Sequence, residues 1–250
     1  ARYSPEQAAV RYRKAADDLA RLGVNLNFGP VVDLNRNRRN PIIARKRRAY
    51  GATTADVLPY AHAFISAHRA AGVLTSAKHF PGHGSSWADS HRRFVDLTKT
   101  WDAVELAPYR ALTGAAAPDM VMVGHLYHPR FSPRGERVPA SLSPAAIRGV
   151  LRGKIGYRGI VITDDLEMAA VTRRYSLKER VIRAIAAGND VIMLSDGTTR
   201  GTGVVDAIHR HVREAVLSGR IGLAQIRAAH ARIIATKARL AGTRREARAD

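Results

Sequence analysis

The chain has 250 residues and is 46% hydrophobic, so it is long enough to form one large domain, or two small ones, around a substantial core. It contains no cysteine, which excludes disulfide scaffolds and thiolate chemistry, and no apolar run approaches the roughly 18 to 20 residues of a membrane span. Its 41 basic and 21 acidic residues give a formal net charge of +20, which indicates either a solvated arginine-rich surface or attraction to a polyanion. We expect the solvated surface, and not nucleic-acid binding, because residues 45–48 are the only tight basic cluster.

Helical and strand-like segments alternate along the chain. Ser4 and Gln7 form a capping box around Pro5 at the start of the first helix, and residues 141–144 are expected to cap the fourth. The helices are predicted at about residues 5–22, 54–71, 102–114, 144–152, 177–187, 203–218 and 223–240. The strands are predicted at about residues 24–28, 72–77, 119–125, 159–164 and 191–194.

The predicted strands are short and continuously apolar, which is typical of a parallel sheet covered by helices on both faces. A doubly wound sheet usually carries a glycine-rich phosphate loop, and neither G-x-G-x-x-G nor a Walker motif is present. A barrel instead places polar groups at the carboxyl ends of several strands. Such residues end the predicted strands here, namely Asn27, Lys78-His79, His125, Asp164 and Ser195-Asp196. We therefore predict an α/β fold of the (β/α)8 TIM-barrel type.

The stretch from Lys78 to His91 gathers three histidines, a lysine and a carboxylate at the mouth of one predicted strand. Asp89 stands two residues from His91, where it can orient the ring for general acid/base work, although an exposed ion pair is the commoner outcome of such spacing. Lys78 and His79 can donate hydrogen bonds to a ligand or form a buried pair satisfied by the backbone. We interpret this stretch as one half of an active site.

Thr163-Asp164-Asp165 ends the most strand-like run and is the expected second half of the site. An aspartate after a strand often caps the next helix, so one of the two carboxylates needs no catalytic explanation. Asp164 is the better candidate to point into the barrel mouth. A metal site built from His79, His83, Asp89 and His91 remains a minority alternative, because no standard zinc spacing is present. A serine hydrolase is less favoured, because no G-x-S-x-G elbow exists.

Six motifs in this order resemble glycoside hydrolase family 3, and specifically its β-N-acetylglucosaminidase branch. The resemblance runs from about residue 24 to residue 196. Its most specific part is the run from Lys78 to Gly84 followed by Asp89-Ser90-His91. The motifs are Asn27-Phe28-Gly29-Pro30-Val31-Val32-Asp33, Arg48-Ala49-Tyr50-Gly51, the run from Lys78 to Gly84, Asp89-Ser90-His91, Pro139-Ala140-Ser141-Leu142-Ser143 and the run from Gly159 to Met168.

The resemblance implies a role for each candidate residue. Asp164 would be the nucleophile that forms a covalent glycosyl-enzyme intermediate, and His91 with Asp89 would be the acid/base dyad, in place of the usual second carboxylate of retaining enzymes. The implied contacts to sugar hydroxyls are Lys78, His79, Arg48 and, with weaker support, His125. The implied substrate is terminal β-linked N-acetylglucosamine, most plausibly on peptidoglycan fragments, with no metal or organic cofactor.

The family pattern has two further strands before Asn27, and five strands cannot close a barrel of the usual size. We therefore expect residues 1–250 to be a single (β/α)-barrel catalytic domain that lacks its first strands, and a second chain is a possible source of them. An inactive or weakly active barrel fragment that binds a partner chain or an anionic polymer is the alternative function. The sequence shows no signal peptide, which favours a bacterial cytoplasm and leaves an exported form open.

Overall fold

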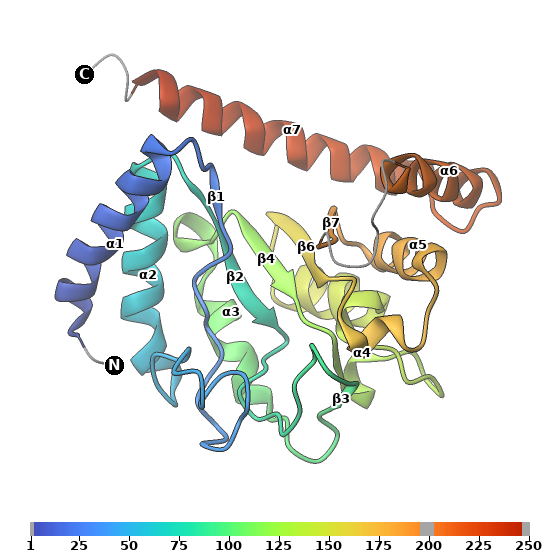
Figure 1. Cartoon of the computed structure of the whole chain (residues 1–250), viewed down its shortest axis with the longest axis horizontal. Coiled ribbons are helices and arrows are strands. Elements are labelled where there is room, and N and C mark those ends of the chain that lie inside the picture. Colours follow the sequence, from blue (N-terminus) through green and yellow to red (C-terminus); the bar gives the residue numbers. More distant parts are fainter. Residues whose placement is uncertain (1–2, 196–202, 247–250) are drawn as a thin grey trace.

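The computed structural model describes residues 3–195 and 203–246. Its centre is a sheet of five strands in the order β1-β2-β4-β6-β7, and every neighbouring pair is parallel (Figure 1). These strands are β1 (Leu26–Asn27), β2 (Leu74–Phe80), β4 (Met120–Val123), β6 (Ile160–Asp165) and β7 (Val191–Met193). A separate parallel pair, β3 (Val95–Asp96) with β5 (Leu126–Tyr127), was not predicted from the sequence. The five strands form a half-barrel sheet, which agrees with the predicted TIM-barrel-like α/β class.

Helices follow most of the strands and cover the sheet. In Figure 1, α1 and α2 lie side by side, and α7 runs across the end of the sheet that is opposite to the strand tips. The α-helices are α1 (Pro5–Arg21), α2 (Thr54–Ala70), α3 (Ala107–Ala111), α4 (Ala169–Thr172), α5 (Leu177–Ala187), α6 (Val204–Leu217) and α7 (Leu223–Glu246). A π-helix spans η5 (Ala145–Lys154), and short 3-10 turns are η1 (Ala103–Leu106), η2 (Gly114–Ala116), η3 (Pro129–Phe131) and η4 (Ala140–Leu142). No helix of the described residues has both the length and the apolar composition that a membrane span requires.

The strand register places the candidate site residues on one face of the sheet. Met120 pairs with Ile160 and Met122 with Ile162, and these four side chains form one apolar cluster. Lys78 is the register partner of Met122, so it lies on the same face. Asp164 follows Ile162 by two residues and therefore shares that face as well. The alternate residues, including Val121 and Val161, pack into the larger core against the covering helices.

Two local predictions were wrong, and each has a physical reason. The helix predicted at 102–114 is a 3-10 turn followed by the short α3, because Pro108 lacks the N–H that a continuous helix would use there. Ser143 does not cap the following helix, because its hydroxyl donates to the carbonyl of Phe131; the helix begins after Pro144 without a side-chain cap. Asp196, which was expected to end the last strand, lies outside the described residues.

Candidate active site

Two adjacent aspartates end β6, and the structure separates their roles. The carboxylate of Asp165 accepts the backbone N–H groups of Glu167 and Ser195, each at 3.0 Å, so Asp165 supports the turn after the strand. Asp164 accepts only the neighbouring N–H of Asp165, through Oδ1 at 2.9 Å, and no hydrogen bond to its Oδ2 is found among the described residues. Asp164 is thus the carboxylate left available to a ligand.

The surroundings of Asp164 keep it ionised. Burial by itself would raise the pKa of this carboxyl, but the nearby imidazoles of His79 and His125 and the N–H of Asp165 outweigh that effect and lower it. A carboxylate that stays charged in a largely buried position is an available nucleophile or electrostatic stabiliser near neutral pH.

His79 is locked in place by a second buried carboxylate, Asp33. Asp33 is 1% exposed, and its Oδ2 lies 2.7 Å from Nδ1 of His79, while its Oδ1 accepts the backbone N–H of His79 and of His83. Burial opposes the charge of Asp33, but the two histidines and the His83 N–H lower its pKa. The ionised Asp33 therefore fixes the proton of His79 on Nδ1.

The other nitrogen of His79 meets Arg48. The distance from Nε2 of His79 to the guanidinium of Arg48 is 3.4 Å, and the same guanidinium approaches the carbonyl of Ile42 at 3.5 Å. Because Nδ1 carries the proton, Nε2 is an acceptor for Arg48. Asp33, His79 and Arg48 thus form one chain of contacts in which Arg48 retains N–H groups for a ligand.

Lys78 lies one residue before His79 on the face of the sheet that also carries Asp164. Its ammonium is half-buried and stands 6.0 Å from the centre of the Phe28 ring. Burial lowers the pKa of Lys78, and repulsion by Arg48 adds to this, while Asp164 and Asp33 oppose it. A partly desolvated cation near Asp164 is suited to binding a hydroxyl or carbonyl oxygen of a substrate.

The sequence-predicted dyad is formed in the loop after β2. Nδ1 of His91 lies 2.7 Å from Oδ1 of Asp89, and the backbone N–H of His91 donates to the same oxygen at 2.9 Å. The His91 side chain is 57% exposed, in contrast to the buried His79. The Asp89 carboxylate fixes the ring proton on Nδ1, which leaves Nε2 of His91 directed away from its partner and able to exchange a proton with a substrate.

The loop that carries this dyad is attached to the segment that follows Asp164. The backbone N–H of Ala169 donates to the carbonyl of His91 at 3.4 Å, and that of Ala170 donates to the carbonyl of Ser90 at 3.2 Å. Ala169 and Ala170 open α4, four residues beyond the β6 tip. These two bonds bring the two sequence-predicted halves of the site next to each other.

His125 is completely buried, with both ring nitrogens engaged by the protein. Nδ1 lies 2.7 Å from the Ser141 hydroxyl, and Nε2 lies 2.7 Å from the carbonyl oxygen of Asp165. A carbonyl only accepts, so Nε2 carries a proton, and burial lowers the pKa of His125 although the neighbouring Asp164 opposes this shift. His125 thus holds the backbone beside Asp164, and a direct contact with sugar remains a prediction.

Sequence reasoning missed Asp33 and Glu105 as parts of this site. Glu105 is buried, accepts the N–H of Gly84 at 2.9 Å, and burial raises its pKa to about 7 despite the Ser85 hydroxyl beside it. Asp33 closes the first of the family motifs, so its position in that motif was the available signal. Glu105 had none, because it stands in a segment that resembled an ordinary helix. Among the described residues, no group of three or more histidine, aspartate or glutamate side chains is arranged to hold a metal ion.

Comparisons with known proteins identify the family of the chain. The family described as "Glycosyl hydrolase family 3 N terminal domain" matches residues 1–236. A β-hexosaminidase of Xylella fastidiosa (strain 9a5c) is 35% identical over 213 residues, which cover 83% of this chain and 60% of that protein. A β-hexosaminidase of Mycobacterium tuberculosis is 40% identical over 204 residues, which cover 75% of this chain and 51% of that protein. The chain thus spans about half the length of such relatives.

Solved structures show the same similarity. The glycoside hydrolase family 3 β-N-acetylglucosaminidase from Paenibacillus sp. str. FPU-7 superposes with a TM-score of 0.86 at 36% sequence identity, over 95% of this chain and 44% of that one. A β-N-acetylhexosaminidase from Beutenbergia cavernae superposes with a TM-score of 0.85 at 27% identity, over 94% of this chain and 69% of that one.

Proposed function

Because this chain belongs to glycosyl hydrolase family 3, we propose that it is the catalytic domain of a retaining β-N-acetylglucosaminidase. Its substrate would be a peptidoglycan fragment with a terminal β-linked N-acetylglucosamine. The observation that carries this proposal is the attachment of the Asp89–His91 loop to the start of α4, five residues beyond Asp164. That arrangement would place the proposed nucleophile and the proposed acid/base group on neighbouring segments at the strand tips.

Asp164 would attack the anomeric carbon in the first step. Its Oδ2 is the oxygen without a protein hydrogen bond among the described residues, so it is the atom proposed to form the new carbon–oxygen bond. The glycosidic oxygen leaves with the Nε2 proton of a His91 imidazolium, whose Nδ1–H remains hydrogen-bonded to Asp89. The histidine then takes a proton from a water molecule, which attacks the same carbon and releases Asp164 with overall retention of configuration.

The remaining predicted residues would divide into contacts and supports. Lys78 and Arg48 have cationic groups left for sugar oxygens, so they are proposed to bind substrate directly. His79 is proposed to act mainly by holding Arg48, since its two nitrogens meet Asp33 and Arg48. His125 is proposed to fix the backbone of Asp165 and, through it, the direction of Asp164.

Azide rescue tests the assignment of both groups. With an activated aryl β-N-acetylglucosaminide, Asp164→Ala should lose almost all activity, and azide should restore product as the α-glycosyl azide, because azide then takes the place of the carboxylate. His91→Ala should instead form the β-glycosyl azide, because the Asp164 intermediate still forms and azide needs no base. Asp165→Asn is the matched control, because it removes a carboxylate charge at the same strand end while its amide oxygen can still accept the N–H groups of Glu167 and Ser195. Undiminished hydrolysis by Asp164→Ala would reject the proposal.

Phosphorolysis is a second candidate reaction for the same residues. A neutral or cationic histidine tolerates an incoming phosphate dianion better than a carboxylate would, and His91 is the acid/base group proposed here. Turnover of the glycoside with and without inorganic phosphate separates the two reactions. Free N-acetylglucosamine in both conditions supports hydrolysis, whereas the sugar 1-phosphate as main product supports phosphorolysis.

A further inference from the structure

A basic groove surrounds the exposed indole of Trp87, on the outer side of the dyad loop. Two adjoining cavities form it, of about 440 and 560 Å³, and Arg39 and Trp87 line both. Trp87 is 58% exposed, which is unusual for the largest apolar side chain. We refer to the two joined cavities as the Trp87 groove; none of the residues argued below for ligand binding has a role in the proposed hydrolysis.

The charge of the groove is strongly one-sided. One wall carries Arg36, Arg38, Arg39, Arg45 and Lys46. The facing loop adds Arg92 and Arg93, and among the described residues the carboxylates in the lining are Asp89 and Asp102. Seven cations therefore face two carboxylates, and Asp89 is already engaged by His91.

These cations lack the counter-charges that some basic residues elsewhere in the chain have. Arg152 of η5 and Arg232 of α7 share Asp190, and Arg220 pairs with Glu179 of α5. None of the seven groove cations takes part in an ion pair within the described part of the chain. Like charges that are gathered without counter-charges create a positive potential, which favours an anionic ligand.

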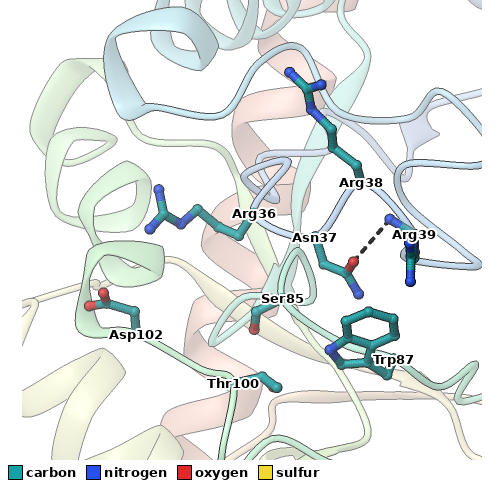
Figure 2. Close-up of a pocket in the computed structure, with 8 residues that line it drawn as sticks. All are labelled: Arg36, Asn37, Arg38, Arg39, Ser85, Trp87, Thr100 and Asp102. Carbon is teal, nitrogen blue, oxygen red and sulfur yellow. Dashed lines mark hydrogen bonds between the residues drawn. The ribbon is translucent and has the colours of Figure 1, made fainter.

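The wall that carries the arginines is held rigidly. The side chain of Asn40 donates to the carbonyls of His83 and Gly84 at 2.6 and 3.1 Å, and that of Asn37 donates to the carbonyl of Ser86 at 2.8 Å. Gly84 packs so closely that an added Cβ would lie 1.6 Å from the carbonyl oxygen of Leu34. Figure 2 shows three arginine side chains fanning out from this fixed backbone, with the Trp87 ring beside Arg39.

From this arrangement we propose that the Trp87 groove binds a linear acidic glycan, a sugar polymer with repeated carboxylate or phosphate groups. The guanidinium groups pair with the anions, which they match bidentately, and the flat apolar face of a sugar ring packs on the indole. A single broad aromatic platform between spaced cations suits a sugar chain. A nucleic-acid strand would stack successive bases, and Trp87 is the one aromatic side chain that lines these two cavities.

Binding measurements on the whole chain test this proposal. The probes are polygalacturonate for carboxylates, a phosphomannan for phosphates, neutral dextran, and a thymidine oligonucleotide. Each is titrated by calorimetry at about 50 and 200 mM salt, two conditions between which the Debye length differs about twofold. Asp164→Ala protein is titrated in parallel, so that binding is measured independently of hydrolysis. We expect one or both acidic glycans to bind and to weaken with salt, and dextran not to bind.

Charge-matched variants locate the surface. Arg39→Gln combined with Arg45→Gln should weaken binding of the acidic glycan at least tenfold, and Trp87→Ala should weaken it several-fold while Trp87→Phe retains most of it. Arg13→Gln combined with Arg227→Gln removes the same charge from exposed positions on α1 and α7 and should change the affinity less than twofold. Equal losses in both double variants, binding of dextran, or tighter binding of the oligonucleotide than of either glycan would overturn the proposal.

Discussion

The two halves of the candidate site are held by opposite means. Asp33 and His79 are almost completely buried and exchange several hydrogen bonds, so their geometry is fixed before any ligand arrives. Asp89 and His91 lie closer to solvent, with side chains 22% and 57% exposed, and two backbone hydrogen bonds link their loop to α4. Under the proposed mechanism, the buried half would bind and position the sugar, and the more exposed half would transfer protons.

This division predicts that changes in the exposed half affect chemistry and not folding. His91→Ala should lower kcat about 10² to 10⁴-fold for a natural disaccharide, since the departing oxygen loses its acid. Its free energy of unfolding should change by no more than about 0.5 kcal/mol, because the ring is mostly exposed. Steady-state kinetics and urea unfolding measure the two effects. A large loss of stability would show that the loop is a structural part of the core. The exposed and buried halves of the site would then not differ in how they affect folding.

Changes in the buried half should affect both properties together. In Asp33→Asn, the amide NH2 would face Nδ1 of His79 and drive the ring proton to Nε2, where Arg48 also donates. Breaking this buried pair should cost about 3 kcal/mol of unfolding free energy. We also expect a raised KM, because Arg48 is displaced. Asp17→Asn, on the exposed side of α1, is the matched control and should be neutral in both assays. An unchanged KM in Asp33→Asn would contradict the proposal that Asp33 positions Arg48 through His79.

Glu105 supports the buried half and should give it a distinctive pH dependence. The pKa of this acid is raised from 4.5 to about 7 in the folded protein, so the folded state holds the proton more tightly than the unfolded state. The contribution of Glu105 to the free energy of unfolding is complete below about pH 4.5 and is lost as the pH rises through about 7. It amounts to at most about 3 kcal/mol. Burial lowers the pKa of His83 to about 4, which produces the opposite slope between pH 4 and 6.5.

The variant Glu105→Gln isolates the contribution of Glu105 from that of His83. An amide is neutral throughout and can still accept the N–H of Gly84. The difference in unfolding free energy between wild type and Glu105→Gln should therefore move in favour of the variant as the pH rises from about 4.5 to 7. Chemical unfolding at several pH values provides the measurement. A constant difference across this range would mean that Glu105 titrates normally and that the loop around Gly84 is open to water.

The same contrast explains what could be predicted from the sequence. Asp89 and His91 are two residues apart, so their pairing follows from local geometry and was predicted correctly. The five strands of the sheet were predicted as well, since a continuous apolar run is a local signal. The contact of Asp33 with His79 joins positions 46 residues apart, and the burial of Glu105 depends on how two loops pack. Such contacts depend on tertiary packing, which composition and periodicity do not record.

The smallest expected effect concerns the attachment between the two halves. Ala169 is the first residue of α4, and Met168 before it has φ −66° and ψ 143°, the extended geometry that a following proline requires. Ala169→Pro should therefore fit and remove only the N–H that donates to the carbonyl of His91. We expect kcat to fall on the order of threefold, because one long hydrogen bond is worth little. Stability should remain close to that of wild type.

Leaving-group dependence makes this small effect interpretable. Ala169→Ser keeps the N–H and serves as the control for a change of side chain at this position. If the bond positions His91 as an acid, the loss in Ala169→Pro should be larger for a sugar leaving group, which needs protonation, than for a nitrophenolate, which does not. An equal loss for both leaving groups would place the effect on the Asp164 side of the attachment. No loss with either would show that the loop reaches its working position without this anchor, and that closure on substrate supplies the whole alignment.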